Sequence, residues 1–152
     1  MHPTPNIPDG FRVARIGGEF LAFNGPLYGK LSADKVQLGF VVEQRHTNPL
    51  GICHGGMLAT FADMLVPCAN MYRQGCERRF LPTINLQIDY LGPARLGAWV
   101  QGEAQILRVT RNMLFGQGLI TADGELAVRF SGIFKLGPPF GDVANNDPLG
   151  LG

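Results

Sequence analysis

The sequence predicts an α+β domain in which one long helix lies against an antiparallel sheet, and two observations lead to this fold class. Five runs of residues alternate between apolar and polar side chains, which is typical of strands with one face on a core. A further run repeats its apolar residues at intervals of three and four, which is typical of a helix. With 152 residues, of which 45% are hydrophobic, the chain suits one core rather than two.

The strands are expected in the order strand, strand, helix and four strands. The alternating runs are VQLGFVVEQ from Val36, TINLQIDYL from Thr83, AWVQGEAQILRV from Ala98, MLFGQGLITA from Met113 and LAVRFSGIFKL from Leu126. Short separators with turn-forming residues lie between them, namely GPARLG before Ala98, RN at 111–112 and ADGE at 122–125. Neighbouring strands are therefore expected to pair as antiparallel hairpins.

The helix is expected from Gly55 to about Tyr72. Its apolar stripe consists of Met57, Leu58, Phe61, Leu65, Cys68, Ala69 and Tyr72. Further apolar residues lie off this stripe, so a sheet that wraps around the helix would explain the pattern. Pro67 has no N–H to donate to the Asp63 carbonyl, and the helix is expected to kink or end there.

The ends of the chain and its overall charge restrict the partners and the compartment. Residues 1–10 and 138–152 are rich in turn formers and are expected to be flexible tails of a single domain, 1–152. The formal charge of +1 is scattered, which argues against nucleic acid and anionic membrane surfaces. There is no signal-peptide pattern and no long apolar span. Three cysteines without C-x-x-C spacing indicate a reducing compartment, so a cytoplasmic location is expected.

The start of the helix is a candidate reaction site. A turn-rich connection from His46 leads to His54, Gly55 and Gly56, and the first N–H groups of a helix have no partner within it. The Gly55 N–H could therefore donate to a polarised carbonyl or an oxyanion, although the glycine pair could equally serve close packing. Asp63 is a lone carboxylate in an apolar run, which indicates a site, a partner or contact with solvent.

Helix geometry indicates that this candidate site would need residues from two subunits. Eight residues separate Gly55 from Asp63, which corresponds to about 12 Å along a helix. One small reacting group cannot contact both residues of the same chain. If both act on one bond, each comes from a different subunit, which predicts an active site at a two-fold dimer interface.

These residues resemble the signature of the PaaI-type hotdog thioesterases. The resemblance rests on Asn48, then Gly51, then His54-Gly55-Gly56, then Asp63, and on a strand that ends in Tyr90-Leu91-Gly92-Pro93-Ala94. It covers roughly residues 27–136. It implies an acyl-CoA thioesterase with a sheet wrapped around a central helix, two subunits sharing a continuous sheet, and dimers that often pair into tetramers.

The resemblance also implies a role for each site residue. Asp63 would be the general base or the nucleophile on the thioester carbonyl, and the Gly55 N–H would polarise the carbonyl oxygen. Asn48 would position the carbonyl or the water, His54 would orient the substrate or the loop, and Thr83 would hydrogen-bond the water or the carboxylate. Alternatively, Asn48 only forms a turn, His54 only satisfies the helix start, and Thr83 is an ordinary strand residue. The Pro67 kink is a hypothesis for what shapes the acyl pocket.

No cofactor is predicted, and the resemblance implies a substrate that carries CoA. Arg95 and Arg111 could meet the CoA phosphates, although solvated strand ends would also explain them, as they would for Arg108. A Cys53 nucleophile beside His54 and a zinc site from His46, Cys53 and His54 are weaker readings, so no metal is predicted.

Two other functional classes stay open at this level. The first is a hotdog hydratase or dehydratase, which would act on the acyl chain. The second is a noncatalytic acyl-CoA-binding protein, which would need the tunnel but not the Asp63 carboxylate. The sequence does not specify the acyl group, the carrier of the thioester, or the choice between dimer and tetramer.

Overall fold

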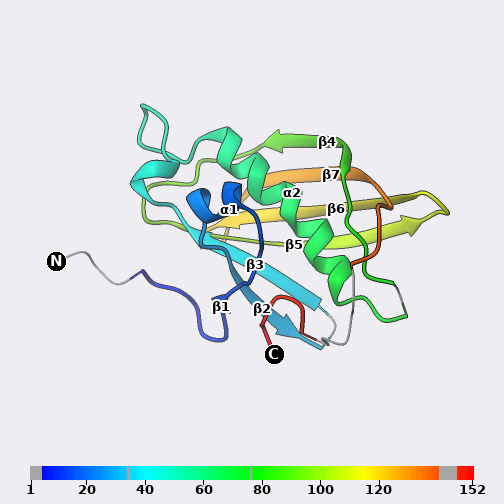
Figure 1. Cartoon of the computed structure of the whole chain (residues 1–152). Helices are drawn as coiled ribbons and strands as arrows, with labels where there is room; N and C mark the ends of the chain where they lie inside the picture. Colours follow the sequence, from blue (N-terminus) through cyan, green and yellow to red (C-terminus); the bar gives the residue numbers. More distant parts are fainter. Residues whose placement is uncertain (1–4, 34, 76, 141–146) are drawn as a thin grey trace.

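A single seven-stranded antiparallel sheet wraps one face of a long helix (Figure 1). The computed structural model describes residues 5–33, 35–75, 77–140 and 147–152. The strands are β1 (Arg12–Val13), β2 (Tyr28–Ser32), β3 (Lys35–Val41), β4 (Thr83–Tyr90), β5 (Trp99–Val109), β6 (Met113–Ala122) and β7 (Glu125–Lys135). The helices are α1 (Glu19–Asn24), the 3-10 helix η1 (Gln44–His46) and α2 (Gly55–Met71). The predicted α+β class is therefore confirmed.

The strand order in the sheet is β1-β2-β3-β5-β6-β7-β4, with every neighbouring pair antiparallel. The expected hairpins between β5 and β6 and between β6 and β7 are present. The expected pairing of β4 with β5 is wrong, because β4 pairs with β7 at the sheet edge, with Tyr90 opposite Val128. Turn chemistry in GPARLG predicts a change of chain direction, but it does not specify which strand edge the chain then meets.

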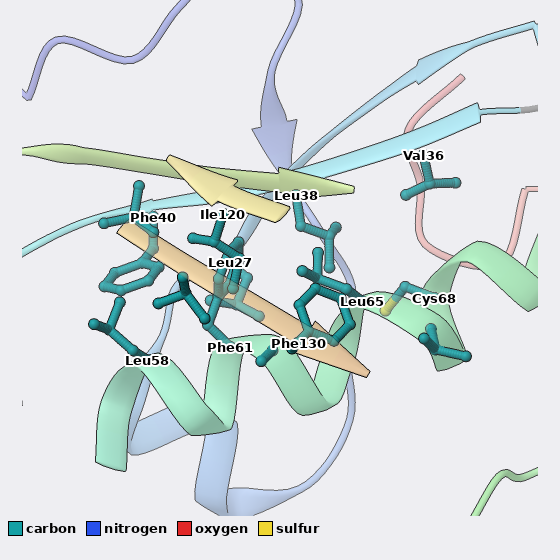
Figure 2. Close-up of a cluster of buried hydrophobic side chains, with 14 of the residues drawn as sticks. Leu27, Val36, Leu38, Phe40, Leu58, Phe61, Leu65, Cys68, Ile120 and Phe130 are labelled. Atoms are coloured by element: carbon teal, nitrogen blue, oxygen red, sulfur yellow. The ribbon is translucent and has the colours of Figure 1, made fainter. Parts of the chain in front are cut away.

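The core lies between α2 and the concave face of the sheet, as Figure 2 shows. Helix side chains such as Phe61 and Leu65 face Phe40 and Phe130 from the sheet, and all four are nearly inaccessible to solvent. Two glycines on the sheet let the helix approach closely. A Cβ at Gly102 would lie 2.8 Å from Leu65 Cδ1, and one at Gly116 would lie 2.7 Å from Val66 Cγ2.

The opposite side of α2 is not covered within one chain. Ala59, Thr60, Asp63 and Pro67 on this side are half-buried, whereas the core-facing stripe is buried. The helix runs through Pro67 to Met71, so the prediction that it could end at the proline is wrong. Residues Leu65 and Val66 before the proline pack on the sheet, and this packing holds the last turn in place.

The last six residues belong to the core rather than to a tail. Leu149 and Leu151 are buried, and Asp147 ties this segment to Tyr72 at the end of α2. The Asp147 carboxylate accepts hydrogen bonds from the Tyr72 hydroxyl at 2.7 Å and from the Leu151 N–H at 2.8 Å. Composition rich in turn formers suggested a segment outside the core, which is wrong for residues 147–152, because two spaced leucines are enough to anchor it. Residues 1–4 and 141–146 lie outside the described part of the chain.

The contact between Asp147 and Tyr72 is expected to make this terminal segment sensitive to acid. The hydrogen bond from Tyr72, with those from the Leu151 and Gly152 N–H groups, lowers the Asp147 pKa from 3.8 to about 2. A lowered pKa stabilises the fold above the ordinary value, and the contribution is lost as the pH falls from about 4 towards 2. Asp147→Asn should therefore melt at a lower temperature than the native protein at pH 6, and the difference should shrink steadily towards pH 2.5. A difference that stays constant with pH would contradict this assignment.

No helix within the described ranges combines the length and apolar character needed to cross a membrane.

Candidate active site

The first turn of α2 exposes one backbone donor. His54 precedes the helix in an extended conformation, and its Nδ1 accepts a hydrogen bond from the Gly56 N–H at 2.8 Å. Among the described residues, the Gly55 N–H has no acceptor. His54 therefore makes the contact expected of a residue that satisfies the helix start, and Gly55 carries the N–H that stays available to a ligand.

The loop that delivers this turn is held at several points. The Leu50 N–H donates to Asn48 Oδ1 at 3.0 Å, so the Asn48 side chain closes a turn before the glycines. The Cys53 N–H donates to the Ala94 carbonyl at 2.7 Å, and Ile52 forms a bridge with Arg95. The turn after β4 thus fixes the loop before α2, although the two segments are about forty residues apart in sequence.

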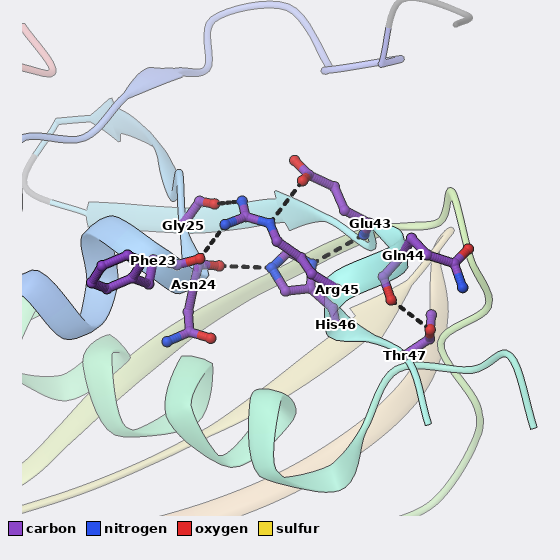
Figure 3. Close-up of polar contacts among 8 residues, drawn as sticks. All are labelled: Phe23, Asn24, Gly25, Glu43, Gln44, Arg45, His46 and Thr47. Atoms are coloured by element: carbon purple, nitrogen blue, oxygen red, sulfur yellow. Dashed lines mark hydrogen bonds and ion pairs between the residues drawn. The ribbon is translucent and has the colours of Figure 1, made fainter. Parts of the chain in front are cut away.

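His46 connects the same loop to the N-terminal part of the chain. Its Nδ1 accepts from the Glu43 N–H at 3.0 Å, and its Nε2 lies 2.7 Å from the Asn24 carbonyl, which requires a proton on Nε2 (Figure 3). Arg45 bonds to the Phe23 and Gly25 carbonyls beside it. The His46 carbonyl in turn accepts from the His54 N–H at 2.7 Å. This buried histidine therefore has a structural explanation for both ring nitrogens.

Asp63 lies on the uncovered side of α2, where it meets the start of β4. The Thr83 hydroxyl donates to Asp63 Oδ1 at 2.5 Å, and both side chains are accessible to solvent. The second carboxylate oxygen accepts no hydrogen bond from the described residues. The structure thus brings Asp63 and Thr83 together, and it leaves one carboxylate oxygen able to bind a water.

Gly55 and Asp63 do not meet within one chain. They occupy the first and ninth positions of one continuous helix, so about 12 Å of helix axis separates them. Gly55 instead contacts Tyr90 at the far end of β4, whose hydroxyl donates to the Gly55 carbonyl at 2.7 Å. Sequence reasoning gave Tyr90 no role of its own, and the only sequence signal was its place before the Leu-Gly-Pro-Ala turn.

The contacts do not support a Cys53 nucleophile or a zinc site formed by His46, Cys53 and His54. Burial raises the pKa of the Cys53 thiol to about 12, so it stays protonated near neutral pH, and its Sγ lies 3.7 Å from the His54 carbonyl. Both His46 ring nitrogens have protein partners, which leaves no nitrogen for a metal. In the part of the chain that the structure describes, no three His, Cys, Asp or Glu residues are grouped to hold a metal ion. Cys76 lies outside that part.

Arg95 and Arg111 lie far apart. Arg95 bridges to the loop before α2, ahead of the start of β5, whereas Arg111 lies in the turn after β5 ends. Eleven strand residues separate these two ends, which corresponds to about 35 Å. The two guanidinium groups of one chain therefore cannot bind the same CoA molecule, and only Arg95 is close to the start of α2.

Comparison with known proteins relates the chain to thioesterases. Residues 50–128 match the family model of the thioesterase superfamily. The mouse acyl-coenzyme A thioesterase 13 is 36% identical over 76 residues, which make up 49% of this chain and 51% of that protein.

Two solved structures are similar over most of their length. The zebrafish thioesterase superfamily member 2 superposes with a TM-score of 0.64 at 30% identity, covering 73% of this chain and 81% of that one. The Escherichia coli PaaI protein of the phenylacetic acid degradation operon superposes with a TM-score of 0.69 at 18% identity, covering 81% of this chain and 87% of that one. At 18% identity, the likeness to the PaaI protein shows a shared fold.

Proposed function

The chain belongs to the thioesterase superfamily, and from this premise we propose that it hydrolyses acyl-CoA thioesters at a site shared by two subunits. The predicted family and the hotdog fold are confirmed by the family match and by the structural likeness to PaaI. The protein is a thioester hydrolase. The proposal adds the CoA thioester as substrate, the residues that act on it and the dimer.

The observation that carries the proposal is the contact between Asp63 and Thr83. A carboxylate in an otherwise apolar helix segment would cost stability unless it had a partner or a function. Here one oxygen accepts the Thr83 hydroxyl at 2.5 Å, and the other has no hydrogen-bond donor among the described residues of this half-buried side chain. This arrangement restricts the rotamer of Asp63 and leaves its second oxygen to accept a proton from water.

In the proposed reaction, Asp63 takes a proton from a water as the water oxygen bonds to the thioester carbon. The Gly55 N–H of the other subunit donates to the carbonyl oxygen as negative charge develops on it. The C–S bond then breaks, and the CoA sulfur takes the proton held by Asp63. The alternative within the same proposal is direct attack by the Asp63 carboxylate, which breaks the C–S bond and releases CoA as a thiolate. Water then hydrolyses the anhydride to two carboxylic groups and supplies the proton that the thiolate takes up.

The dimer is proposed because one chain cannot supply both groups. β4 is an edge strand, with a row of unpaired backbone groups, and it carries the exposed apolar side chain of Ile84. The uncovered side of α2 carries the small or half-buried residues Gly56, Ala59 and Thr60 next to Asp63. Antiparallel pairing of two such faces around a two-fold axis would bring the Gly55 of each chain towards the Asp63 of the other.

Supporting roles are proposed for the remaining residues. Arg95, next to the loop before α2, is the candidate for a CoA phosphate, since guanidinium suits phosphate. Arg111 would have to act from a different subunit. Asn48 holds the loop through its side-chain oxygen and keeps its amide nitrogen available to position the carbonyl or the water.

The proposal is tested by measuring free thiol released from a panel of aryl, short-chain and medium-chain acyl-CoAs, with the matching pantetheine thioesters alongside. Release from at least one CoA thioester would support the proposal, and the panel would rank the acyl groups. Binding of acyl-CoA without thiol release would favour the noncatalytic class. With an enoyl-CoA added to the panel, loss of its double bond without thiol release would favour a hydratase.

A further inference from the structure

The peptide group between Gly55 and Gly56 is held at both of its polar atoms. Its carbonyl oxygen accepts the Tyr90 hydroxyl at 2.7 Å, and its N–H donates to His54 Nδ1 at 2.8 Å. One bond comes from the end of β4 and the other from the residue before the helix. Two such bonds on opposite sides fix the orientation of this peptide plane.

This arrangement determines which amide of the helix start can act on a ligand. The Gly56 N–H is occupied by His54, whereas the Gly55 N–H has no acceptor among the described residues. The Gly55 N–H belongs to the peptide whose carbonyl, that of His54, accepts from the Met57 and Leu58 N–H groups at 2.9 and 3.2 Å, so the helix holds this peptide on its His54 side. The bond from Tyr90 holds the Gly55 carbonyl, so the residue that carries the N–H is held on both of its sides.

The Tyr90 ring adds a second restriction. A Cβ placed on Gly55 would lie 3.3 Å from both the Cζ and the hydroxyl oxygen of Tyr90, so the ring lies directly against this glycine. Tyr90 is nevertheless 54% exposed. Within the single chain, the hydroxyl bond to the helix main chain and the ring contact with Gly55, rather than burial, hold this side chain.

We propose that Tyr90 is a positioning residue that holds the Gly55 N–H in the direction of the thioester oxygen. This inference rests on the proposed function, because it assumes that Gly55 polarises the carbonyl. Tyr90 acts through Gly55 and does not need to contact the reacting atoms. Preorganised donors stabilise a developing oxyanion more than a donor that must be ordered during the reaction.

The test compares Tyr90→Phe with the native protein and with Tyr28→Phe. The control suits this purpose because Tyr28 lies in β2 beside Trp99, and its hydroxyl makes no hydrogen bond to the described residues. Tyr90→Phe should lower kcat by about three- to tenfold, the effect of losing one neutral hydrogen bond, with little change in KM. Tyr28→Phe should leave kcat unchanged.

Two further measurements distinguish a positioning role of Tyr90 from a general increase in flexibility of the protein. A CoA thioether of the same chain has no carbonyl oxygen, so its Kd should be the same for all three proteins. In an amide NMR spectrum, the Gly55 N–H signal should shift or broaden in Tyr90→Phe, and signals from β2 should not. Equal kcat values for Tyr90→Phe and the native protein, or an unchanged Gly55 signal, would overturn the inference.

The failure of the inference can be told apart from the failure of the function. If the native protein released no thiol from any substrate, the proposed function would fall. The Gly55 amide signal would then still decide whether Tyr90 orders the helix start. If the native protein is active and Tyr90→Phe is equally active, the function stands and the role of Tyr90 falls.

Discussion

Asp63→Asn is expected to lower kcat for thioester hydrolysis by about a thousandfold, within the range that loss of a general base produces. The amide oxygen of asparagine can still accept the Thr83 hydroxyl, which donates at 2.5 Å in the native protein. The fold and the position of the side chain should therefore persist. What is lost is the ability to take a proton from water, so thiol release should slow to this extent while acyl-CoA binding continues.

Asp89→Asn is the matched control for this substitution. Asp89 lies on the same strand as Thr83 and pairs with Arg129 at 2.7 Å on the exposed surface. Removal of a surface ion pair has a small effect on stability and should leave kcat unchanged. If Asp63→Asn kept more than a tenth of the native kcat, Asp63 could not be the base. After a single turnover in ¹⁸O-labelled water, label found in the Asp63 carboxylate would identify Asp63 as the nucleophile, because a general base exchanges no oxygen with water.

Gly55→Pro is expected to lower kcat by about a hundred- to a thousandfold, the effect of removing one oxyanion donor. Proline deletes the N–H itself, and it is well tolerated at the first position of a helix. His54 before it has φ −60° and ψ 137°, a conformation compatible with a following proline. The helix should therefore form normally while the donor is missing.

Gly55→Ala separates the donor from the added bulk. Alanine keeps the N–H but introduces the same Cβ, which would lie 3.3 Å from the Tyr90 ring. Its activity should fall much less than that of Gly55→Pro. Equal losses in the two variants would show that crowding against Tyr90, rather than loss of the N–H, causes the defect.

The two inactive variants also test the shared site. In a mixture of Asp63→Asn and Gly55→Pro subunits that have been allowed to exchange, half of the dimers are hybrids. Each hybrid has one site with both groups intact, so activity should recover to about a quarter of the native value. No recovery, with hybrids demonstrated by mass spectrometry, would mean that each chain acts alone.

Much of the fold could be predicted because its signals are local. The period of three and four residues located α2 to within a residue of its observed start and end, and alternation located β3 to β7. β1, β2 and α1 have only two to six residues each, which is too short for a periodic pattern. The partner of β4 depends on pairing with β7, from Thr83 with Phe134 to Tyr90 with Val128, and turn chemistry cannot specify so distant a contact.

The candidate site could likewise be predicted only in part from the sequence. Gly55 and Asp63 could be selected from the sequence because each is unusual in its own segment. The contacts of Asp63 with Thr83 and of Gly55 with Tyr90 join α2 to the two ends of β4, and only the folded chain shows them. The role of residues 147–152 was missed because their leucines lie among turn-forming residues.

The glycines beneath α2 link positions that are distant in the chain. Gly102 leaves room for Leu65, and Gly116 leaves room for Val66, with no space for a Cβ at either glycine. A larger residue on the sheet would be accommodated best together with a smaller one on the helix. Among descendants of a common ancestor, residues 102 and 65, and residues 116 and 66, should therefore change in opposite directions of size.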